Sequence, residues 1–542
     1  MPFASKHGEV SVPNVTLTEY VLSGADTAPA GATAFTDGPS GHSVPYSSLR
    51  KLVDGVASGL WQRGLRKGDV LAIFMPNYPA YFFAFHGAAS IGVIVTTLNP
   101  VYTSDEIAHQ MRDSGAVAIV TVSALLEKVD GAVARGAPLR RVFVVDAETA
   151  DEGARPPRTP FDVLLHDGGS PPPVHIEPSR DTLAIPYSSG TSGLPKGVVL
   201  THSNVVANLR QINANRRLNA MSSDDVVLGV LPFFHIYGMV IVLNFALSCG
   251  AHVVTMPGFD PPLFLRLLKS HGVSVVHAAP PIIGFLAKHP SVEAVLPLPR
   301  LREIMSGAAP LGAELASAAM GRLGLRELRQ GYGMTEMAPV SHMMPLGRGG
   351  SCIGSIGELM PSMRCKIVAT DTGKEVGVGE RGELWLAGPN IMQGYLNRPE
   401  ATASTIDADG FLHTGDVGYV DGEGRYYVVD RVKELIKVKG FQVAPAELEA
   451  LLLSDERVAD AAVIGVPDER SGELPKAYVV RQPKWPLSVD DVKAYVAART
   501  TSYKHLAYVE FVDAVPKSAA GKILRKELRK MEEERRGARS KL

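Results

Sequence analysis

The chain has 542 residues, of which 20% are charged, and its formal net charge is −1. A chain of this length exceeds what one hydrophobic core usually supports, so we expect several structural units. The balanced charge excludes the strongly basic surface typical of nucleic-acid-binding proteins, and we expect no nucleic-acid partner. Three cysteines without C-x-x-C spacing exclude a disulfide scaffold and favour a reducing compartment.

Short apolar runs alternate with helical patterns through the first half of the chain. This alternation is typical of an α/β fold in which helices flank parallel sheets. The expected elements are strands over 70–75, 93–96 and 117–122, and helices over 80–91 and 104–114.

The segment from Tyr187 to Gly197 (YSSGTSGLPKG) lies between two apolar runs and predicts a phosphate-binding loop. Glycines allow backbone N–H groups to converge on an anion, the hydroxyls add donors, and the lysine adds charge. The pattern is not G-x-x-x-x-G-K-[ST], and its composition is also compatible with a flexible linker. The candidate phosphate-binding residues are Ser188, Ser189, Gly190, Thr191, Ser192, Gly193 and Lys196.

The most apolar stretch, Met239 to Met256, is interrupted by Asn244, Gly250 and His252. We therefore interpret it as a buried helix followed by a strand, not as a membrane span. Because the first 14 residues also lack a hydrophobic signal core, we expect no integral membrane protein.

The second half of the chain changes character twice. Short runs with turn signals over 373–388 predict a small β-rich subdomain, and a strand near 426–430 then leads into charged residues. Beyond it, alternation over 435–439 places Lys437 and Lys439 on one side of a strand. Further expected elements are helices over 445–453 and 489–498 and strands over 461–466 and 477–480. We divide the chain into an N-terminal domain (1–430), a C-terminal α+β domain (431–535) and a tail (536–542).

The last three residues, Ser540, Lys541 and Leu542, match the S-K-L address that the peroxisomal import receptor reads. The charged segment before them predicts an accessible tripeptide. We expect a peroxisomal protein with this receptor as a partner, or a cytoplasmic protein otherwise. In a prokaryotic host the tripeptide would carry no meaning.

Five further segments, together with the phosphate loop, resemble the acyl-adenylate-forming (AMP-binding) superfamily in order and approximate spacing. They are PFFHIYG (232–238), QGYGMTE (330–336), HTGD (413–416), the stretch from Asp430 to Gln442, and PKSAAGKILR (516–525). Within the superfamily, residues 433–449 are most similar to 4-coumarate:CoA ligases and their peroxisomal acyl-CoA synthetase and beetle-luciferase relatives. The resemblance implies a large N-terminal domain and a mobile, small C-terminal domain.

The resemblance also implies an acid:CoA ligase that uses ATP, Mg²⁺ and CoA. A carboxylate attacks the α-phosphorus of ATP, pyrophosphate leaves, and the acyl-AMP then reacts with a thiol. Lys522 would bridge the carboxylate and the α-phosphate, and Glu336 would hold Mg²⁺. Asp416, supported by Arg431, would accept hydrogen bonds from both ribose hydroxyls. The remaining residues that the resemblance assigns to ATP or AMP are Ala308, Gln330, Gly331, Tyr332, Thr335 and Lys433.

A second set of residues would serve thioester formation. By resemblance, Lys437 and Gln442 act in that state, while Lys439 and Gly440 meet CoA. The family rotates its small domain between the two half-reactions, here about a hinge near 431–433. His235 either gates the carboxylate or fills the wall of the site.

The resemblance places an acyl pocket along Ile236, Tyr237, Val240, Met305, Gly307, Pro339 and Val340. Hydroxycinnamate enzymes usually carry Asn at the position of Val240 and Lys at that of Met305. Both differences remove polar groups, so we expect a pocket that accepts medium or long aliphatic acids alongside, or instead of, 4-coumarate. The alternatives are a luciferase-like monooxygenase that oxidises an acyl-adenylate, a non-catalytic AMP-binding protein, and an enzyme that loads a carrier protein.

Overall fold

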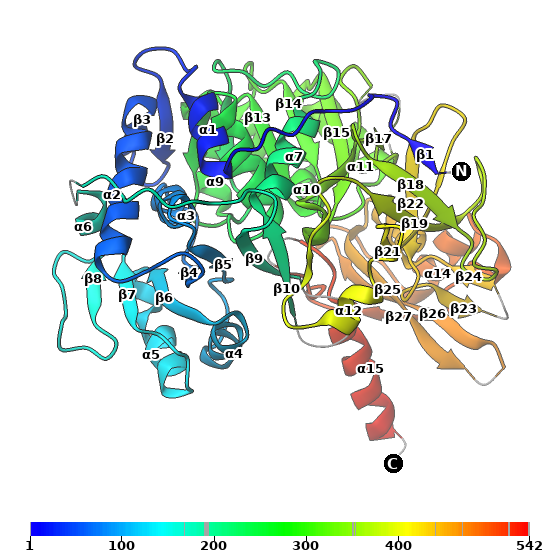
Figure 1. Ribbon diagram of the computed structural model, residues 1–542. Coiled ribbons are helices and arrows are strands. Elements are labelled where there is room, and N and C mark those ends of the chain that lie inside the picture. The colour runs from blue at the N-terminus through cyan, green and yellow to red at the C-terminus, as the bar shows by residue number, and fades with distance from the viewer. Residues whose placement is uncertain are drawn as a thin grey trace.

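The computed structural model describes most of the chain (Figure 1). The described residues are 2–166, 169–188, 195–348, 352, 354–438, 441–468, 470–518 and 521–539. Several expected ligand-binding residues lie outside them, namely Ser189, Gly190, Thr191, Ser192, Gly193, Lys439 and Gly440. The tripeptide at 540–542 also lies outside the described residues.

Two large sheets form the body of the N-terminal region. The first has eight strands in the order β20 (Gly394–Tyr395), β10 (Lys196–Thr201), β9 (Thr182–Ser188), β5 (Ile94–Thr97), β4 (Val70–Phe74), β6 (Ala116–Thr121), β7 (Arg141–Val144) and β8 (Arg158–Pro160). From β9 to β8 neighbouring strands are parallel, whereas β10 pairs antiparallel with both of its neighbours. The parallel sheet expected from the alternating pattern is confirmed.

Alternate residues of β4 face different layers of helices. Ile73 packs into the core that contains α3 (Ala80–Ser90), whereas Ala72 and Phe74 pack into the core that contains α4 (Ser104–Ser114). Because side chains alternate along a strand, both faces of the sheet are buried. This explains why the parallel strands have continuous apolar sequences.

The second sheet has nine strands in the order β17 (Glu358–Leu359), β16 (Val340–Met343), β15 (Glu327–Gly333), β14 (Glu303–Ser306), β13 (Val275–Ala278), β11 (Val226–Gly229), β12 (His252–Thr255), β2 (Thr33–Asp37) and β3 (Ser43–Pro45). The strands from β15 to β2 are parallel. One face packs with α9 (Pro261–Ser270), α10 (Pro280–Lys288) and α11 (Ala313–Leu323). The other face belongs to the core that the two sheets share.

A buried helical segment separates β11 from β12. It begins as a π-helix, η3 (Gly238–Phe245), and continues as α8 (Ala246–Ser248). The prediction of a buried helix followed by a strand over Met239–Met256 is therefore confirmed. Among the described residues, no helix is both long and apolar enough to cross a membrane.

A smaller antiparallel sheet follows in the chain. Its strands are β1 (Phe3–Ala4), β18 (Arg364–Val368), β19 (Gly382–Ala387), β21 (Leu412–Val420) and β22 (Tyr426–Arg431). The β-rich subdomain expected around 373–388 is confirmed, although the sheet extends well beyond that range. It also includes β1 from the N-terminus, because Phe3 pairs with Cys365.

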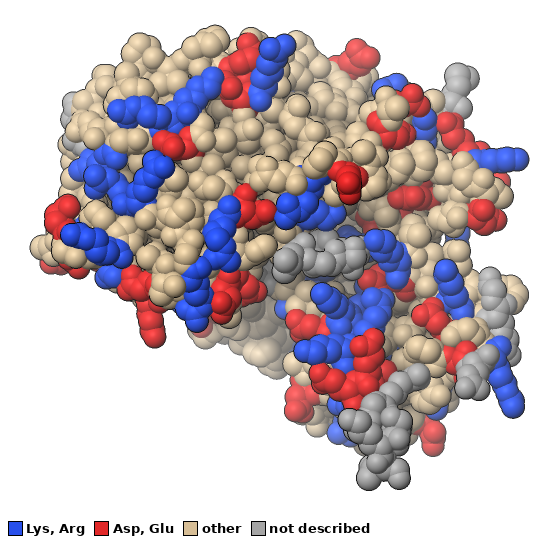
Figure 2. All heavy atoms as spheres, turned by 60° about the horizontal axis from the view of Figure 1, so that its bottom comes forward, with Lys and Arg blue, Asp and Glu red and all other residues tan. Residues whose placement is uncertain are grey.

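The C-terminal unit is built on a separate sheet. Its strands are β24 (Phe441–Val443), β23 (Ile436–Val438), β26 (Gly472–Arg481), β25 (Val458–Asp468) and β27 (Tyr508–Phe511). Its helices are α13 (Pro445–Leu453), α14 (Val489–Ala497) and α15 (Arg525–Arg539). Figure 1 shows this unit in orange and red beside the larger body, and Figure 2 shows acidic and basic side chains interspersed on the face it presents.

Local patterns in the C-terminal unit agree with the structure. Ile436 and Val438 of β23 are buried while Lys437 is exposed, which confirms the predicted alternation. β22 ends at Arg431 and β23 begins at Ile436. The division at 430/431 and the hinge near 431–433 stay predictions.

Candidate active site

The base of the phosphate loop is a β-hairpin formed by β9 and β10. Ser188 pairs with Lys196, and Tyr187 with Gly197. A Cβ at Gly197 would lie 2.7 Å from Ile185 Cγ2, so the packing of the Ile185 side chain favours glycine there. The flanking strands therefore set Ser188 and Lys196 side by side at the start of the loop, whose tip lies outside the described residues.

Tyr187 also connects this hairpin to the first sheet's helical layer. Its hydroxyl donates a hydrogen bond to Asp113 Oδ2 at 2.7 Å, and Arg398 pairs with Asp113 Oδ1 at 3.1 Å. Asp113 lies in α4 and Arg398 just before the short helix α12 (Pro399–Ala403). Asp113 thus ties the hairpin from which the loop projects to α4, and it is itself paired with Arg398 from a third segment.

A lysine, a tyrosine and a glutamate line up beside the hairpin. Lys196 Nζ lies 4.3 Å from the centroid of the Tyr395 ring, within the range of a cation–π interaction. The Tyr395 hydroxyl donates a hydrogen bond to Glu336 Oε1 at 2.9 Å. Glu336 is buried in the 3-10 turn η5 (Thr335–Met337). Tyr395 was not identified from the sequence, because a single Gly-Tyr pair carries no signal of this contact.

Asp416 is held by two neighbours on different sheets. The register of β21 and β22 places it opposite Arg431, whose Nε lies 3.1 Å from Asp416 Oδ1. The Tyr332 hydroxyl, from β15, donates to Asp416 Oδ2 at 2.5 Å. Burial, with the Asp416 charge, raises the pKa of Tyr332, so this hydroxyl keeps its proton. A carboxylate fixed in this way is suited to accept hydrogen bonds from the hydroxyls of a ribose.

Lys522 reaches the same region from the C-terminal unit. The preceding Gly521 has φ +81°, and a Cβ there would lie 3.2 Å from Ala279 and from Pro281 in the large domain. The loop therefore docks closely beside the N-terminal end of α10. Arg525, at the start of α15, anchors the loop to its own unit through Glu449, at 2.8 and 2.6 Å.

The charges around Lys522 are mixed. The pKa of Lys522 is lowered to about 8, first by burial and next by the charge of Arg431, and the charges of Asp416, Glu434 and Glu336 offset this lowering only in part. Burial also lowers the pKa of His235 to about 4, with a further contribution from Lys522. The charge of Lys522 therefore interacts both with these acidic residues and with His235, which is neutral near neutral pH.

Other expected site residues are spread over this arrangement. Thr335 and Gln330 are buried, and Gln330 accepts a hydrogen bond from the Leu311 backbone at 3.2 Å. Ala308 is exposed and has a positive φ of 71°, while Lys433 is exposed. Lys437 and Gln442 pair across β23 and β24, both with exposed side chains. The structure therefore brings Lys522, and not Lys437, into the charged cluster.

A cavity of about 90 Å³ lies along the second sheet, and His235 is among the residues that line it. Side chains that share one face of three parallel strands line it, because alternate residues of a strand point the same way. These residues are Val275 and His277 of β13, Glu303 and Met305 of β14 with Gly307 just after it, and Arg329, Gly331 and Gly333 of β15.

The expected acyl-pocket residues line this cavity with one exception. Ile236, Tyr237, Met305, Gly307, Pro339 and Val340 all line it. Val240 does not, whereas its neighbour Ile241 does. The expectation for Val240 came from the resemblance, and both residues lie in the buried π-helix η3.

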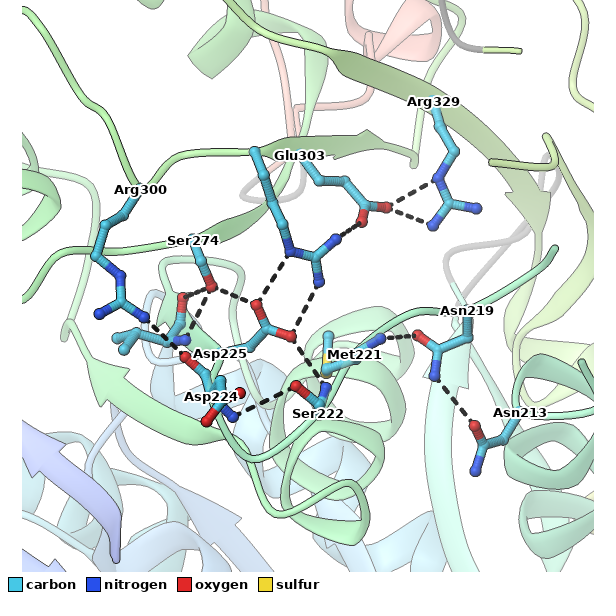
Figure 3. A network of polar contacts seen from close by, with 12 residues as sticks. Asn213, Asn219, Met221, Ser222, Asp224, Asp225, Ser274, Arg300, Glu303 and Arg329 are labelled. Atoms are coloured by element: carbon cyan, nitrogen blue, oxygen red, sulfur yellow. Dashed lines mark hydrogen bonds and ion pairs between the residues drawn. The ribbon is translucent and has the colours of Figure 1, made fainter. Parts of the chain in front are cut away.

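The far end of the cavity is polar. Arg329 Nε donates to Glu303 Oε1 at 2.9 Å, and its Nη1 donates to the carbonyls of Leu218 and Met344, each at 2.9 Å. Figure 3 shows Glu303 between Arg329 and the polar network around Asp225. The sequence did not reveal this ion pair, since either residue alone is typical of a protein surface.

The site is compatible with Mg²⁺ bound mainly through the nucleotide. No group of three or more His, Cys, Asp or Glu side chains suited to a metal occurs among the described residues. Mg²⁺ commonly takes only one or two carboxylates and completes its shell with phosphates and water. The buried carboxylate of Glu336, beside Lys196 and Tyr395, fits that requirement.

Comparison with protein families identifies the arrangement. Residues 23–396 match the family described as AMP-binding enzyme, and residues 447–522 match the AMP-binding enzyme C-terminal domain. The chain is 40% identical to 4-coumarate–CoA ligase 3 of Oryza sativa subsp. japonica, over 97% of this chain and 94% of the relative. It is 41% identical to 4-coumarate–CoA ligase 1 of Petroselinum crispum, over 91% and 90%.

Solved structures show the same architecture. ATP-bound MatB from Rhodopseudomonas palustris has a TM-score of 0.84 at 27% identity and covers 96% of this chain and 99% of its own. A benzoate CoA ligase from Burkholderia xenovorans has a TM-score of 0.83 at 25% identity, over 95% and 100%. The chain belongs to the AMP-binding enzyme family and is an AMP-forming acid:CoA ligase that uses ATP and CoA.

The pKa of Lys522 leads to a prediction about pH. If the ammonium form is required, kcat/KM for ATP in acyl-AMP formation falls as the pH rises through about 8, because the free enzyme loses that proton there. Single-turnover assays without CoA exclude titration of the thiol. Arginine stays charged, so the remaining activity of Lys522→Arg should keep its rate to higher pH. An identical decline in both proteins would assign it to another group.

Proposed function

We propose that the acid substrate of this ligase is a largely apolar acid of phenylpropenoic or medium-chain length. The observation that carries the proposal is the cavity on one face of β13, β14 and β15, which is lined by His235 and by the Glu303–Arg329 pair. In the proposed arrangement the carboxylate of the acid lies at His235, beside Lys522, and its tail extends along the strands towards the ion pair.

The strands give the length of that tail. From Gly307 to Glu303 is four residues, or roughly 13 Å at about 3.3 Å per residue. An extended backbone covers roughly 3.5 Å in three bonds, so this span accommodates about eleven bonds. A phenylpropenoic acid or a chain of about ten carbons fits within it, whereas a sixteen-carbon chain would have to displace the ion pair. This narrows the aliphatic range expected from the sequence.

The walls support the same proposal. A Cβ at Gly307 would lie 2.5 Å from Tyr237 Cε1, so glycine allows the aromatic ring to lie across the strand end. Ile236, Ile241 and Met305 supply apolar surface between the entrance and the far end. Burial of apolar tail surface against them favours binding by roughly 25 cal/mol for each Å² removed from water.

The reaction then proceeds with each group in a defined role. A carboxylate oxygen attacks the α-phosphorus, the bond to the β-phosphate breaks, and pyrophosphate leaves with the electron pair. The Lys522 ammonium offsets the negative charge that gathers on the α-phosphate and carboxylate. Asp416, held by Tyr332 and Arg431, fixes the ribose. Attack of the CoA thiolate on the acyl carbon then expels AMP.

The test is a screen of acids for CoA-dependent AMP release. We expect kcat/KM to be highest among cinnamic acids and C6 to C10 acids and at least tenfold lower for C16. Lys522→Ala should lose acyl-AMP formation by about 10²–10³-fold but still transfer supplied acyl-AMP to CoA. A C16 optimum would contradict the proposed length. Light emission with luciferin, without CoA consumption, would favour the monooxygenase instead.

We also propose the peroxisomal import receptor as a partner, on the basis of Ser540, Lys541 and Leu542. A fluorescent protein fused to the N-terminus of the full chain should co-localise with a peroxisomal marker in cells that contain peroxisomes. Removal of 540–542 should leave the fusion in the cytosol. The same distribution for both fusions would contradict the proposal that the import receptor binds this chain.

A further inference from the structure

Tyr395 contacts both a cation and an anion of the site. Lys196 Nζ lies 4.3 Å from the centroid of its ring, and its hydroxyl lies 2.9 Å from Glu336 Oε1. Because an ionised carboxylate only accepts hydrogen bonds, the hydroxyl is the donor. One aromatic side chain therefore holds the lysine on its face and the glutamate at its hydroxyl.

Backbone pairing, and not the phenol, brings Tyr395 to the base of the phosphate loop. Its strand β20 pairs antiparallel with β10, where Tyr395 lies opposite Val198. The Leu396 N–H donates to the Gly197 carbonyl at 2.8 Å, and the Tyr395 N–H donates to Thr402 Oγ1 at 2.8 Å. We therefore expect a substitution that removes only the hydroxyl to leave the backbone in place.

The two charged groups that Tyr395 contacts are not paired with each other. Among the described residues, neither Lys196 nor Glu336 has an ion-pair partner, and each has Tyr395 as its side-chain contact. Opposite charges that share a site attract one another strongly. An ion pair between them would have to break before the lysine could meet a phosphate or the carboxylate a metal ion. Tyr395 keeps both charges available.

The Glu336 carboxylate is held at one oxygen and open at the other. Oε1 accepts the hydrogen bond from Tyr395. Oε2 has no hydrogen-bond partner in the described part of the chain, yet it is not among the fully enclosed side-chain atoms that lack one, so it faces accessible space. Mg²⁺ commonly takes one or two protein carboxylates and completes its shell with phosphates and water. One oriented, open oxygen suits that requirement.

We propose that Tyr395 is a positioning residue for the metal–nucleotide complex, whose hydroxyl orients the Glu336 carboxylate and whose ring holds the Lys196 ammonium ready for a phosphate. Partners that hydrogen-bond a metal-binding carboxylate fix its orientation, and their loss typically weakens metal binding by about 10–100-fold. None of these contacts involves the organic acid, so they serve whichever acid the ligase accepts.

The test measures ATP binding with and without metal, in the absence of acid and CoA, so that no turnover occurs. Calorimetric titration gives the Kd for ATP in excess Mg²⁺ and in EDTA, and the ratio of the second to the first is the metal coupling. Tyr395→Phe should lower this coupling about tenfold, because the carboxylate loses its donor. The Kd in EDTA should stay within about twofold, because the ring still contacts Lys196.

A second variant separates the ring from the hydroxyl. Tyr395→Leu removes both, so the Lys196 side chain has to be ordered when a phosphate binds. We expect its Kd for ATP in EDTA to be about threefold higher than that of Tyr395→Phe, the effect of immobilising one long side chain. Equal values for the two variants would contradict the role of the ring.

Two controls test whether the hydroxyl acts through Glu336. Glu336→Gln should abolish the metal coupling, and adding Tyr395→Phe should lower it no further, because both changes act on one carboxylate. Tyr427→Phe removes another hydroxyl that donates to a carboxylate, that of Asp421 at 3.3 Å, and should leave the coupling unchanged. Thermal unfolding of each variant monitors folding.

Three results would overturn the role of the hydroxyl. They are a coupling that Tyr395→Phe retains, an equal loss of ATP affinity with and without Mg²⁺, which would indicate structural damage, and a coupling that Glu336→Gln retains. In each case CoA-dependent AMP release by the wild-type protein would leave the proposed function standing.

Discussion

The balance of charge around the Lys522 ammonium is the constraint on which the rest of the site depends. A lysine side chain that leaves water favours its neutral form, and burial lowers the pKa of Lys522 to about 8. The carboxylates of Asp416, Glu434 and Glu336 counter that effect. The amine comes from the C-terminal unit, whereas Asp416 and Glu336 belong to the larger region. Because the pKa is lowered overall, burial and the positive charge of Arg431 outweigh these three carboxylates where the two units meet.

The acyl cavity is less uniform, because its lining changes from glycine to apolar to charged residues along the same strands. Gly307, Gly331 and Gly333 line the cavity near the carboxyl ends of the strands. The Glu303–Arg329 pair closes the amino ends with charges that satisfy each other. Much of the remaining lining is apolar, and its polar side chains include those of His277, Tyr237 and Asn219.

Much of the fold could be predicted from the sequence because local pattern determined it. The helix over 104–114 and the alternation around Lys437 agree with the structure, since burial on one face imposes a regular spacing of apolar residues. The hairpin at the base of the phosphate loop follows from two apolar runs around a glycine-rich segment. The superfamily resemblance pointed to Asp416, Glu336 and Lys522 as site residues, which residue type alone could not have done, and their roles stay predictions.

What the sequence could not show is contact between distant residues. The hydrogen bond from Tyr395 to Glu336, and the juxtaposition of His277 with Tyr237, each join residues from separate strands or loops. In the π-helix η3, Ile241 lines the acyl cavity and Val240 does not. These features arise from packing and strand register, and no spacing rule in one segment reports them.

The most direct measurement of the central claim is isotope exchange between labelled pyrophosphate and ATP, because it reports capture of the α-phosphorus by a carboxylate without any thiol. With a cinnamic or medium-chain acid present and CoA absent, the label should enter ATP. Without acid it should not. Correctly folded protein that catalyses no exchange with any of these acids, or exchanges equally well without them, would contradict the account.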